Sequence, residues 1–541
     1  MTQETPAFFT LDRGTVSTTA ALIAPVDGRY RMVAAGAAPV GVDPESVLED
    51  LAWRVARTDA SLAGSMESWR EWSRLEVFTG RPPRAVLVAA SDETGELLER
   101  ALVGGGWTIG DRFFGADPDI IGLGEACLDP NTDAVVMGGR DGVGEDEHET
   151  AQRLWPRAAS LARFRDDLAV IACGPFADRP EGIPDGRLFS LPAPDPVPVT
   201  SESTLRGAAL QVGRHLADRG ATPGIDARTA LRASVGSLAS VLGTTVDGIE
   251  IGVAAASRTL ARPGAEQGHG VFAGAGMLPR RLLDDEDGVD AVLRWCTLGG
   301  GDPAARLDGL RNLVLDPWAS WGMDDSHLRM AALRSALERL EASWLGAERS
   351  ASGQPGAGVV VLSGGALVGL PPAAVAMALV DGVRRAGAVS LLHDHAGVLA
   401  PLGALPVEAD RQRLISDLMV DCLLPLGSAI VTGTIPERKK GKTPAAMSIA
   451  SSLGDQRLRL EPGQLQLVDL PPGISARIGI DPGQGTILGS EGGPISMEVN
   501  GGLGGLFVDT RPIPLDLPAG GEVRRAAIEA WEAPVWIGSE R

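Results

Sequence analysis

The stretch FTLDRGTVSTTAAL, residues 9–22, decides the fold that we expect for this chain. A short apolar run leads into an acidic residue, a glycine and several hydroxyl side chains, namely Asp12, Gly14, Thr15, Ser17 and Thr18. Glycine allows a turn to approach a ligand closely, and the hydroxyls and amides after it can donate hydrogen bonds to phosphate oxygens. Asp12 can hold a hydrated Mg2+. The pattern suits a nucleotide-phosphate loop, and it also suits a plain hairpin turn.

The residues around this loop indicate further strands and helices. Alternating apolar side chains predict an antiparallel meander of three strands over residues 8–35. Residues 44–58 place apolar side chains at helical spacing, which predicts an amphipathic helix. Short apolar runs at residues 84–90, 134–139 and 168–173 alternate with helical stretches, which is typical of a parallel α/β layer.

Strands and helices continue to alternate in the second half of the chain. Residues 248–256 (GIEIGVAAA) predict a strand that continues toward Ser257. Residues 328–345 predict an amphipathic helix that is capped by Ser326. Residues 358–362 predict a strand, and the glycine turn that follows it contains Ser363, Gly364, Gly365 and Ala366.

The last part of the chain has a different pattern. After residue 404 short alternating runs are separated by glycine and proline turns, which predicts a β-rich C-terminal module. A final helix is expected over residues 521–531.

Composition excludes several classes of function. The length of 541 residues predicts a multidomain protein, and the net charge of -21 argues against binding nucleic acid or an anionic membrane. A single tyrosine, Tyr30, leaves little material for stacking on bases. The N-terminus lacks a signal-peptide pattern and no segment offers about 18 uninterrupted apolar residues, so we expect a cytoplasmic protein. The four cysteines match no disulfide or zinc spacing, and the oligomeric state is left open.

Glycine turns near Asp12, Glu250 and Gly364 suit a nucleotide that is held between two similar α/β halves. The chain resembles the superfamily of actin, sugar kinases and heat-shock chaperones, and within it the glutamate mutase L (MutL) family, whose members are encoded near adenosylcobalamin-dependent mutases. The resemblance extends over most of the chain. It includes AVVMGGRDG at residues 134–142 and, closer to the C-terminus, VLSGGALV, LHDHAGVLAPLGAL and MEVNGGLGGLFVDTRPIPL.

The resemblance implies an α/β fold with duplicated actin-like (ribonuclease H-like) nucleotide-binding domains. The first half would occupy residues 1–215 with an α/β layer inserted at about 84–190, the second half residues 216–405, and the β-rich module residues 406–541. It also implies that ATP and Mg2+ are cofactors. In the family, the proposed role is that of a chaperone or reactivating factor for a cobalamin-dependent mutase, which would be the partner of this chain.

The resemblance assigns site residues loop by loop. The first phosphate loop contains Asp12, Gly14, Thr15, Ser17 and Thr18, and the adenosine loop contains Ser363, Gly364, Gly365 and Ala366. In the second phosphate loop Glu250 and Gly252 stand where the family has Asp-x-Gly-Gly-x-Thr-Thr, so the acid is longer and the threonines are replaced by alanine. An added methylene shifts a catalytic carboxylate by roughly 1 Å, which is enough to slow hydrolysis.

Three functions stay open on this basis. The first is a nucleotide-binding accessory protein with weak ATPase activity, in which Glu250 and Asp12 would be catalytic and Asp12 would hold Mg2+ through water. The second is a nucleotide-independent scaffold that has lost phosphate chemistry. The third is a small-molecule kinase of the same superfamily, for which the sequence offers no evident base.

Other motifs favour structural roles. PERKKGKTP at residues 436–444 lacks the first glycine of a P-loop and is expected to be a solvated basic loop. The acidic run GEDEHE at residues 144–149 is expected to be a solvated loop as well. His393 and His395 flank Asp394 without a third ligand, so we expect them to be structural, in a segment that returns to pack the two halves together.

Overall fold

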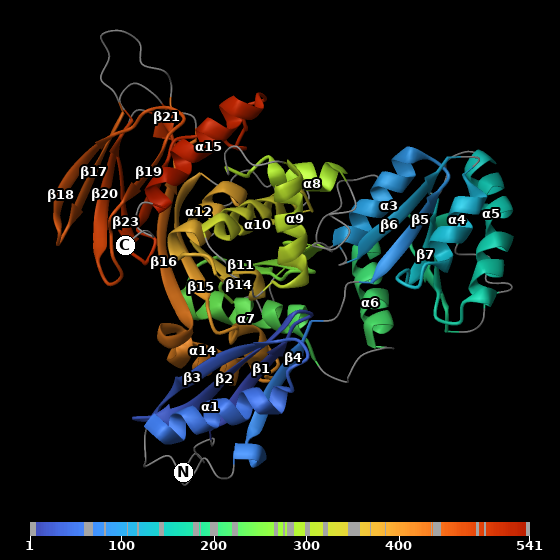
Figure 1. Cartoon of the computed structure of the whole chain (residues 1–541), viewed down its shortest axis with the longest axis horizontal. Helices are drawn as coiled ribbons and strands as arrows, with labels where there is room; N and C mark the ends of the chain where they lie inside the picture. Colours follow the sequence, from blue (N-terminus) through green and yellow to red (C-terminus); the bar gives the residue numbers. More distant parts are fainter. Residues whose placement is uncertain are drawn as a thin grey trace.

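The structure is a computed structural model of the whole chain (Figure 1). It describes residues 7–58, 69–79, 83–104, 107–115, 118–139, 145–176, 183, 186–194, 204–218, 225–264, 269–273, 276–278, 286–297, 303–317, 323–343, 358–367, 369–384, 386–433, 435, 445–482, 486–488, 490–491 and 494–536. The basic run at residues 436–444 lies outside these ranges.

The first sheet forms around the opening stretch. Its order is β10-β4-β1-β2-β3, and its strands are β1 (Phe8–Arg13), β2 (Ser17–Val26), β3 (Arg29–Pro39), β4 (Ser73–Phe78) and β10 (Ile225–Asp226). Strands β1, β2 and β3 are antiparallel neighbours, which confirms the predicted meander, whereas β4 runs parallel to β1 and β10 runs parallel to β4.

Alternation of side chains explains why this sheet is covered on both faces. Phe8 and Ile23 belong to the core beneath one face, and Phe9 and Leu22 belong to the core beneath the other, because successive strand residues point to opposite sides. The second of these cores includes the apolar stripe of α1 (Pro44–Thr58). The amphipathic helix predicted from the sequence therefore covers the outer face of the first sheet.

The second sheet repeats the order of the first. It begins β13-β12-β11-β14-β15, with strands β11 (Val246–Ile251), β12 (Ala256–Ala261), β13 (His269–Ala273), β14 (Val359–Ser363) and β15 (Gly387–Asp394). Again the first three strands in sequence are antiparallel neighbours, the fourth is parallel to the first, and the fifth is parallel to the fourth. This repetition is the duplicated actin-like (ribonuclease H-like) fold, and it confirms the predicted fold class.

Helices separate the two sheets. One core joins buried residues of both sheets with α7 (Ala227–Leu242), α13 (Leu399–Gly403) and α14 (Glu408–Cys422). Figure 1 shows α7 and α14 between the first and second sheets. The far side of the second sheet is covered by α8 (Glu286–Leu293), α9 (Pro303–Leu315), α10 (Met323–Ser343), α12 (Pro372–Gly382) and α15 (Gly521–Trp536).

The β-rich C-terminal part continues the second sheet beyond residue 405. Strands β16 (Leu423–Val431), β24 (Leu506–Asp509) and β19 (Leu465–Val468) follow β15 in its hydrogen-bonding order. A separate sheet packs on this extension around a shared core. Its strands, in order, are β18 (Gly454–Arg459), β17 (Ala446–Ser451), β20 (Ser475–Asp481) and β23 (Ile495–Asn500), and a small pair is formed by β21 (Thr486–Ile487) and β22 (Ser490–Glu491).

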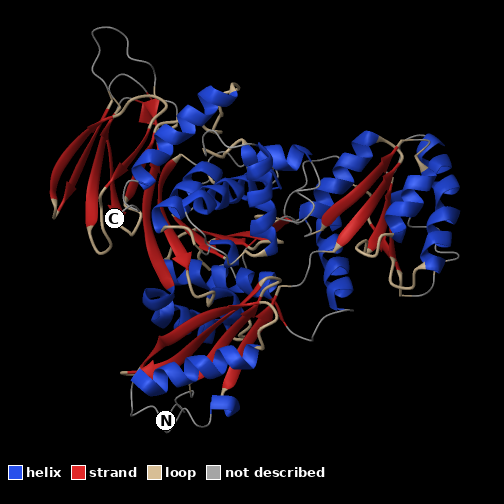
Figure 2. Cartoon of the chain, viewed as in Figure 1, coloured by secondary structure: helices blue, strands red, loops and turns tan. Residues whose placement is uncertain are grey.

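The inserted layer is a parallel sheet of its own, at the right of Figure 2. Its order is β6-β5-β7-β8-β9, formed by β5 (Arg84–Ala89), β6 (Thr108–Phe114), β7 (Ala134–Gly138), β8 (Ala169–Cys173) and β9 (Leu188–Leu191). All neighbours are parallel, which confirms the predicted layer and matches the flavodoxin-like order 2-1-3-4-5. Its helices are α3 (Asp92–Gly104), α4 (Ile120–Leu128), α5 (Glu145–Phe164) and α6 (Thr204–Asp218).

The structure corrects four local predictions. The acidic run belongs to helix α5 from Glu145 onward, and α10 begins at Met323, so that Ser326 lies inside the helix. The predicted strand at residues 248–256 is a hairpin, because β11 ends at Ile251 and Ser257 lies on the returning strand. The last helix continues to Trp536, with Pro534 inside its final turn.

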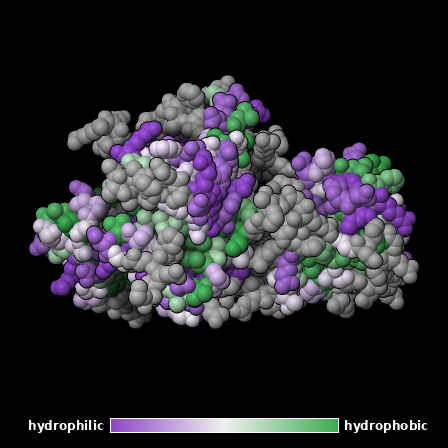
Figure 3. All heavy atoms as spheres, turned by 90° about the horizontal axis from the view of Figure 1, so that it is seen from below, coloured by the Kyte–Doolittle hydropathy of each residue, from purple (hydrophilic) through white to green (hydrophobic). Residues whose placement is uncertain are grey.

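The surface has a mixed character. Seen from below, hydrophilic and hydrophobic residues lie side by side over the described parts of this face (Figure 3). Within the described residues, no helix has both the length and the apolar content that a membrane span requires.

Candidate functional site

Two equivalent hairpins face each other across the two halves. In the first, the amide of Gly14 donates to the carbonyl of Ser17 at 2.7 Å, and in the second, the amide of Gly252 donates to the carbonyl of Ala255 at 2.8 Å. Asp12 pairs with Thr19 across the first hairpin, as Glu250 pairs with Ser257 across the second. The structure therefore aligns the two phosphate loops predicted from the sequence and gives each one an acid with a hydroxyl opposite it.

The hairpins and the ends of neighbouring strands enclose a cavity of about 260 Å3. Small-molecule sites usually have volumes of about 300–1,000 Å3, so this cavity is slightly smaller than that range. Its walls come from both halves, and its lining residues are Asp12, Gly14, Thr15, Val16, Ser17, Thr19, Ala37, Thr79, Arg228, Glu250, Gly252, Val253, Ala255, Ala256, Pro317, Ser363, Gly364, Gly365, Leu367, His393, Asp394, His395 and Gly397.

The glycine turn after β14 comes close to the second hairpin. Gly364 has a φ of 112°, which side chains rarely adopt, and a Cβ there would lie 2.2 Å from the carbonyl oxygen of Ile251. A Cβ on Gly365 would lie 2.8 Å from the hydroxyl of Ser17 in the first half. Glycine is therefore required at Gly364, where two backbones of the second half approach each other, and Gly365 leaves room for the Ser17 side chain of the first half.

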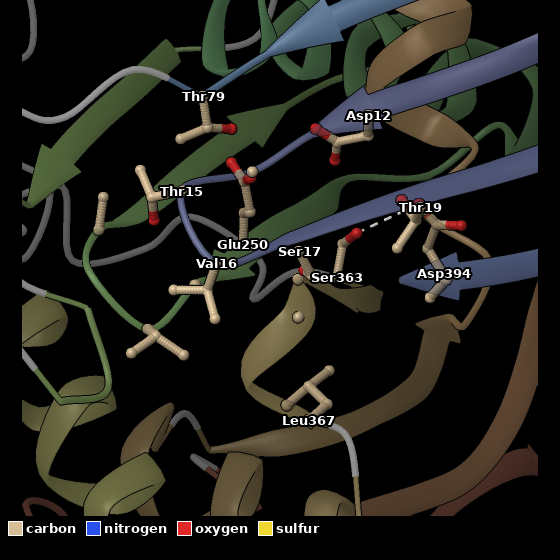
Figure 4. Close-up of a pocket in the computed structure, with 18 of the residues that line it drawn as sticks. Asp12, Thr15, Val16, Ser17, Thr19, Thr79, Glu250, Ser363, Leu367 and Asp394 are labelled. Atoms are coloured by element: carbon tan, nitrogen blue, oxygen red, sulfur yellow. Dashed lines mark hydrogen bonds between the residues drawn. The ribbon is translucent and has the colours of Figure 1, made fainter. Parts of the chain in front are cut away.

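Asp12 is the most unusual side chain of the cavity. Its Oδ1 atom is buried and has no hydrogen-bond partner within the described part of the chain. Burial, together with the nearby carboxylates of Glu250 and Asp394, raises the pKa of Asp12 well above its ordinary value. Figure 4 shows Asp12, Glu250 and Thr79 on one side of the cavity.

The other two carboxylates are held by neighbours. Glu250 accepts a hydrogen bond from Ser257 at 3.1 Å. Burial raises the pKa of Glu250, and the Ser257 bond and the charge of Arg228 oppose that rise. Asp394 accepts from the hydroxyl of Ser363 at 3.2 Å, the bond that is dashed in Figure 4, and from the amides of Val398 and Leu399 at 3.0 Å each.

Burial also raises the pKa of Asp394. The described lining of the cavity thus combines three carboxyl groups, those of Asp12, Glu250 and Asp394, with one arginine, Arg228. Among the residues that the structure describes, no three His, Cys, Asp or Glu side chains are placed to ligate one metal ion directly. The arrangement therefore suits a cation that is held through its water shell.

Most of the predicted site residues lie on this cavity. They are Asp12, Gly14, Thr15, Ser17, Glu250, Gly252, Ser363, Gly364 and Gly365. Thr18 is buried in the sheet instead, because neighbouring strand residues point to opposite faces. Ala366 is buried in the core behind the second sheet. The structure therefore does not bring Thr18 and Ala366 to the cavity.

Sequence reasoning missed several lining residues. Thr19 was overlooked because it belongs to the strand after the loop, and strand alternation with Ser17 would have identified it. Thr79 and Arg228 follow β4 and β10, two strands that were not predicted. Asp226 has the recognisable pattern of an acid before an apolar helix, and its side chain caps α7.

Two histidines also reach the cavity. Burial lowers the pKa of His393 to about 4, so this ring is neutral at physiological pH, and the charge of His395 adds to the effect. The Nδ1 atom of His395 lies 2.9 Å from the carbonyl of Cys422, which can only accept, so Nδ1 carries the proton of this bond.

Comparisons with known proteins identify no family for this chain. No family model matches the sequence, and no curated protein matches it. Component A of the (R)-2-hydroxyglutaryl-CoA dehydratase of Acidaminococcus fermentans is 11% identical, with 75% of this chain and 99% of that chain covered and a TM-score of 0.28.

Two further solved structures are similar to the same extent. The activator of the 2-hydroxyisocaproyl-CoA dehydratase from Clostridium difficile with bound ADPNP is 10% identical, with 75% of this chain and 96% of that chain covered and a TM-score of 0.27. A ligand-bound xylulose kinase from Lactobacillus acidophilus is 10% identical, with 76% and 92% covered and a TM-score of 0.26. The assignment of this chain to the actin-like fold rests on its own repeated strand order.

Proposed function

We propose that the cavity binds ATP together with Mg2+ between the two halves of the chain. The observation that supports this most directly is the buried Oδ1 atom of Asp12, which has no hydrogen-bond partner among the described residues. A buried acid without a partner is costly unless a cation or a donor compensates it. A hydrated Mg2+ supplies positive charge together with water donors, and Asp12, Glu250 and Asp394 would hold it through those waters.

The loops around the carboxylates suit phosphate groups. The hairpin at Gly14 and the turn at Gly364 expose backbone and hydroxyl donors, including those of Thr15, Ser17 and Ser363, to the same cavity. Magnesium would offset the repulsion between phosphates and carboxylates. Hydrolysis is expected to be slow, because Glu250 is one methylene longer than the family's aspartate and a shift of roughly 1 Å weakens the positioning of a nucleophile.

Isothermal titration tests this function. The wild type should bind ATP in the presence of Mg2+ and more weakly with a chelator. Asp12→Asn should weaken binding about 10- to 100-fold in Mg2+, as removal of a metal-supporting group usually does, and should change little without the metal. Asp308→Asn, at an exposed ion pair that does not line the cavity, is the control. Absence of binding by the wild type, or equal binding by Asp12→Asn, would overturn the proposal.

The accessory role is a further part of this proposal, and it rests on the resemblance to the glutamate mutase L family. In this role the chain would protect or reactivate an adenosylcobalamin-dependent mutase, and nucleotide binding would change the closure of the two halves. A pull-down with such a mutase, performed with and without ATP, tests it. If no mutase component is recovered in either condition, the proposal that a mutase is the partner of this chain is wrong.

A nucleotide-independent scaffold is the second candidate. The second hairpin favours it, because Val253, Ala254 and Ala255 offer no hydroxyl where the first hairpin has Thr15 and Ser17. A scaffold would melt at the same temperature with and without Mg-ATP, whereas a nucleotide-binding protein gains RT ln(1 + [L]/Kd) in stability. One thermal melt therefore separates the two candidates.

A further inference from the structure

Arg228 lies in the first turn of α7 and lines the cavity. It follows β10, a strand of the first sheet, so the first half extends beyond the boundary expected at residue 215. Strand β10 ends at Asp226, whose carboxylate caps helix α7 by accepting from the amide of Thr229 at 2.9 Å. The Nε and Nη2 atoms of Arg228 each lie 3.2 Å from the same carboxylate. The guanidinium thus contacts the carboxylate that caps α7, and only 11% of its side chain is exposed.

The helix itself does not explain a cation at this position. The first turn of a helix favours negative charge, so an arginine there is stabilising only beside an anion. Asp226 provides one anion, and the pair is partly exposed, which limits its contribution to stability. A phosphate group in the cavity would be attracted by the guanidinium, while Asp226 continues to cap the amide of Thr229.

Arg228 is also the one arginine or lysine among the described residues that line the cavity. The acids there are Asp12, Glu250 and Asp394, and only Glu250 has a pKa that the charge of Arg228 lowers appreciably. Glu250 belongs to the second half, so the charge of Arg228 acts across the gap between the two halves. A nucleotide bound between the hairpins would place its phosphates among these groups.

We propose that Arg228 is the positioning residue with which the first half recognises the terminal phosphate of a nucleoside triphosphate. This inference rests on the proposed nucleotide function. Arginine donates two parallel hydrogen bonds to a phosphate, so the terminal phosphate replaces the carboxylates as the partner of the guanidinium. A diphosphate leaves Arg228 with Asp226 and Glu250. The site thereby distinguishes ATP from ADP by a residue at the start of α7.

Titration calorimetry with Mg-ATP, Mg-ADP and adenosine tests the inference on the full chain. Arg228→Gln should weaken ATP binding about tenfold or more, since a hydrogen bond to a charged group is lost. It should change ADP binding by less than about threefold and leave adenosine binding unchanged. Arg228→Lys should recover part of the loss, because lysine keeps the charge without the planar fork.

The controls separate this inference from the function on which it rests. Arg54→Gln removes an arginine from an exposed ion pair on α1 and should leave all three affinities unchanged. A melt without nucleotide should show that Arg228→Gln folds as the wild type does. The inference is wrong if the wild type binds ATP but Arg228→Gln weakens the binding of ATP and of ADP to the same extent. It is also wrong if the variant weakens the binding of neither nucleotide. If the wild type does not bind ATP, the proposed function itself fails, and the inference fails with it.

Discussion

Gly403 of α13 lies against Ala230 of α7 so closely that a Cβ on Gly403 would be 1.8 Å from the carbonyl oxygen of Ala230. Helix α7 follows the last strand of the first sheet, and α13 follows β15 of the second. The hydroxyl of Ser234 adds a hydrogen bond of 2.5 Å to the carbonyl of Leu399. The two halves are therefore joined by backbone contact between helices that begin beside the cavity.

Gly403→Ala should destabilise the protein by about 1–3 kcal/mol, because the added methyl group forces two helix backbones apart. Thermal melting measures the change. Gly207→Ala on α6 is the control, since a Cβ there meets no atom within 4 Å, and alanine in place of a helical glycine should raise stability by up to about 1 kcal/mol. Equal melting temperatures for the two variants would contradict the close contact between Gly403 and Ala230.

Gly364→Ala should reduce the affinity for Mg-ATP strongly, because its Cβ would collide with the backbone of Ile251 and displace the turn beside the cavity. Gly454→Ala is a matched control: its φ of 119° is similar to the 112° of Gly364, but a Cβ there meets nothing within 4 Å. Both variants bear backbone strain of about 1–2 kcal/mol. Only Gly364→Ala should lose nucleotide binding in a titration, and a loss in both would point to general strain instead.

Asp381→Ala should lower stability by about 3–5 kcal/mol, because it removes the carboxylate that two buried arginines share and leaves each of them with one carboxylate, Glu532 for Arg334 and Asp509 for Arg511. Asp381 accepts from Nε of Arg334 at 2.7 Å and from Nη2 of Arg511 at 2.6 Å, and all three side chains are fully buried. Denaturant unfolding monitored by tryptophan fluorescence is the measurement. Asp308→Ala, at an exposed ion pair with Arg311, should cost no more than about 1 kcal/mol.

Glu532 should make the docking of α15 sensitive to acid. Burial tends to raise the pKa of Glu532, but Arg334, His327 and Trp536 outweigh it and lower the pKa to about 2, from the ordinary 4.5. A depressed folded-state pKa contributes stability above pH 4.5, and that stability is lost as the pH falls from 4.5 toward 2. The difference in melting temperature between wild type and Glu532→Gln should therefore be largest near neutral pH and shrink over this window. A constant difference would contradict the assignment.

Local patterns in the sequence were sufficient to predict the strands and helices whose apolar residues recur at regular spacing. The meander from β1 to β3, the helix α1 and the buried strands β5, β7 and β8 were all predicted, because alternation and helical spacing are local properties. The hairpin at Gly252 was read as one strand, since GIEIGVAAA contains no polar residue that marks the turn. The resemblance placed Gly252 in a loop that corresponds to the one at Gly14, and the register of the paired strands shows that this loop is a hairpin turn.

In the candidate site, too, some features follow from local sequence patterns and others only from the tertiary structure. Acid, glycine and hydroxyl residues marked the first loop within a few positions of sequence, because a tight turn near a ligand requires those residue types. Local patterns in the sequence thus predicted the inserted parallel layer and the meander that contains the first loop, and the resemblance supplied the expectation of two similar α/β halves and the assignment of the loops. Tertiary structure decided which side chains meet across the cavity: β10 and the start of α7 bring Arg228 to the same cavity as Glu250, 22 positions further along the chain. The physical reason is that burial, charge coupling and backbone contact between the halves join residues that are more than twenty positions apart, and no local pattern records those distances.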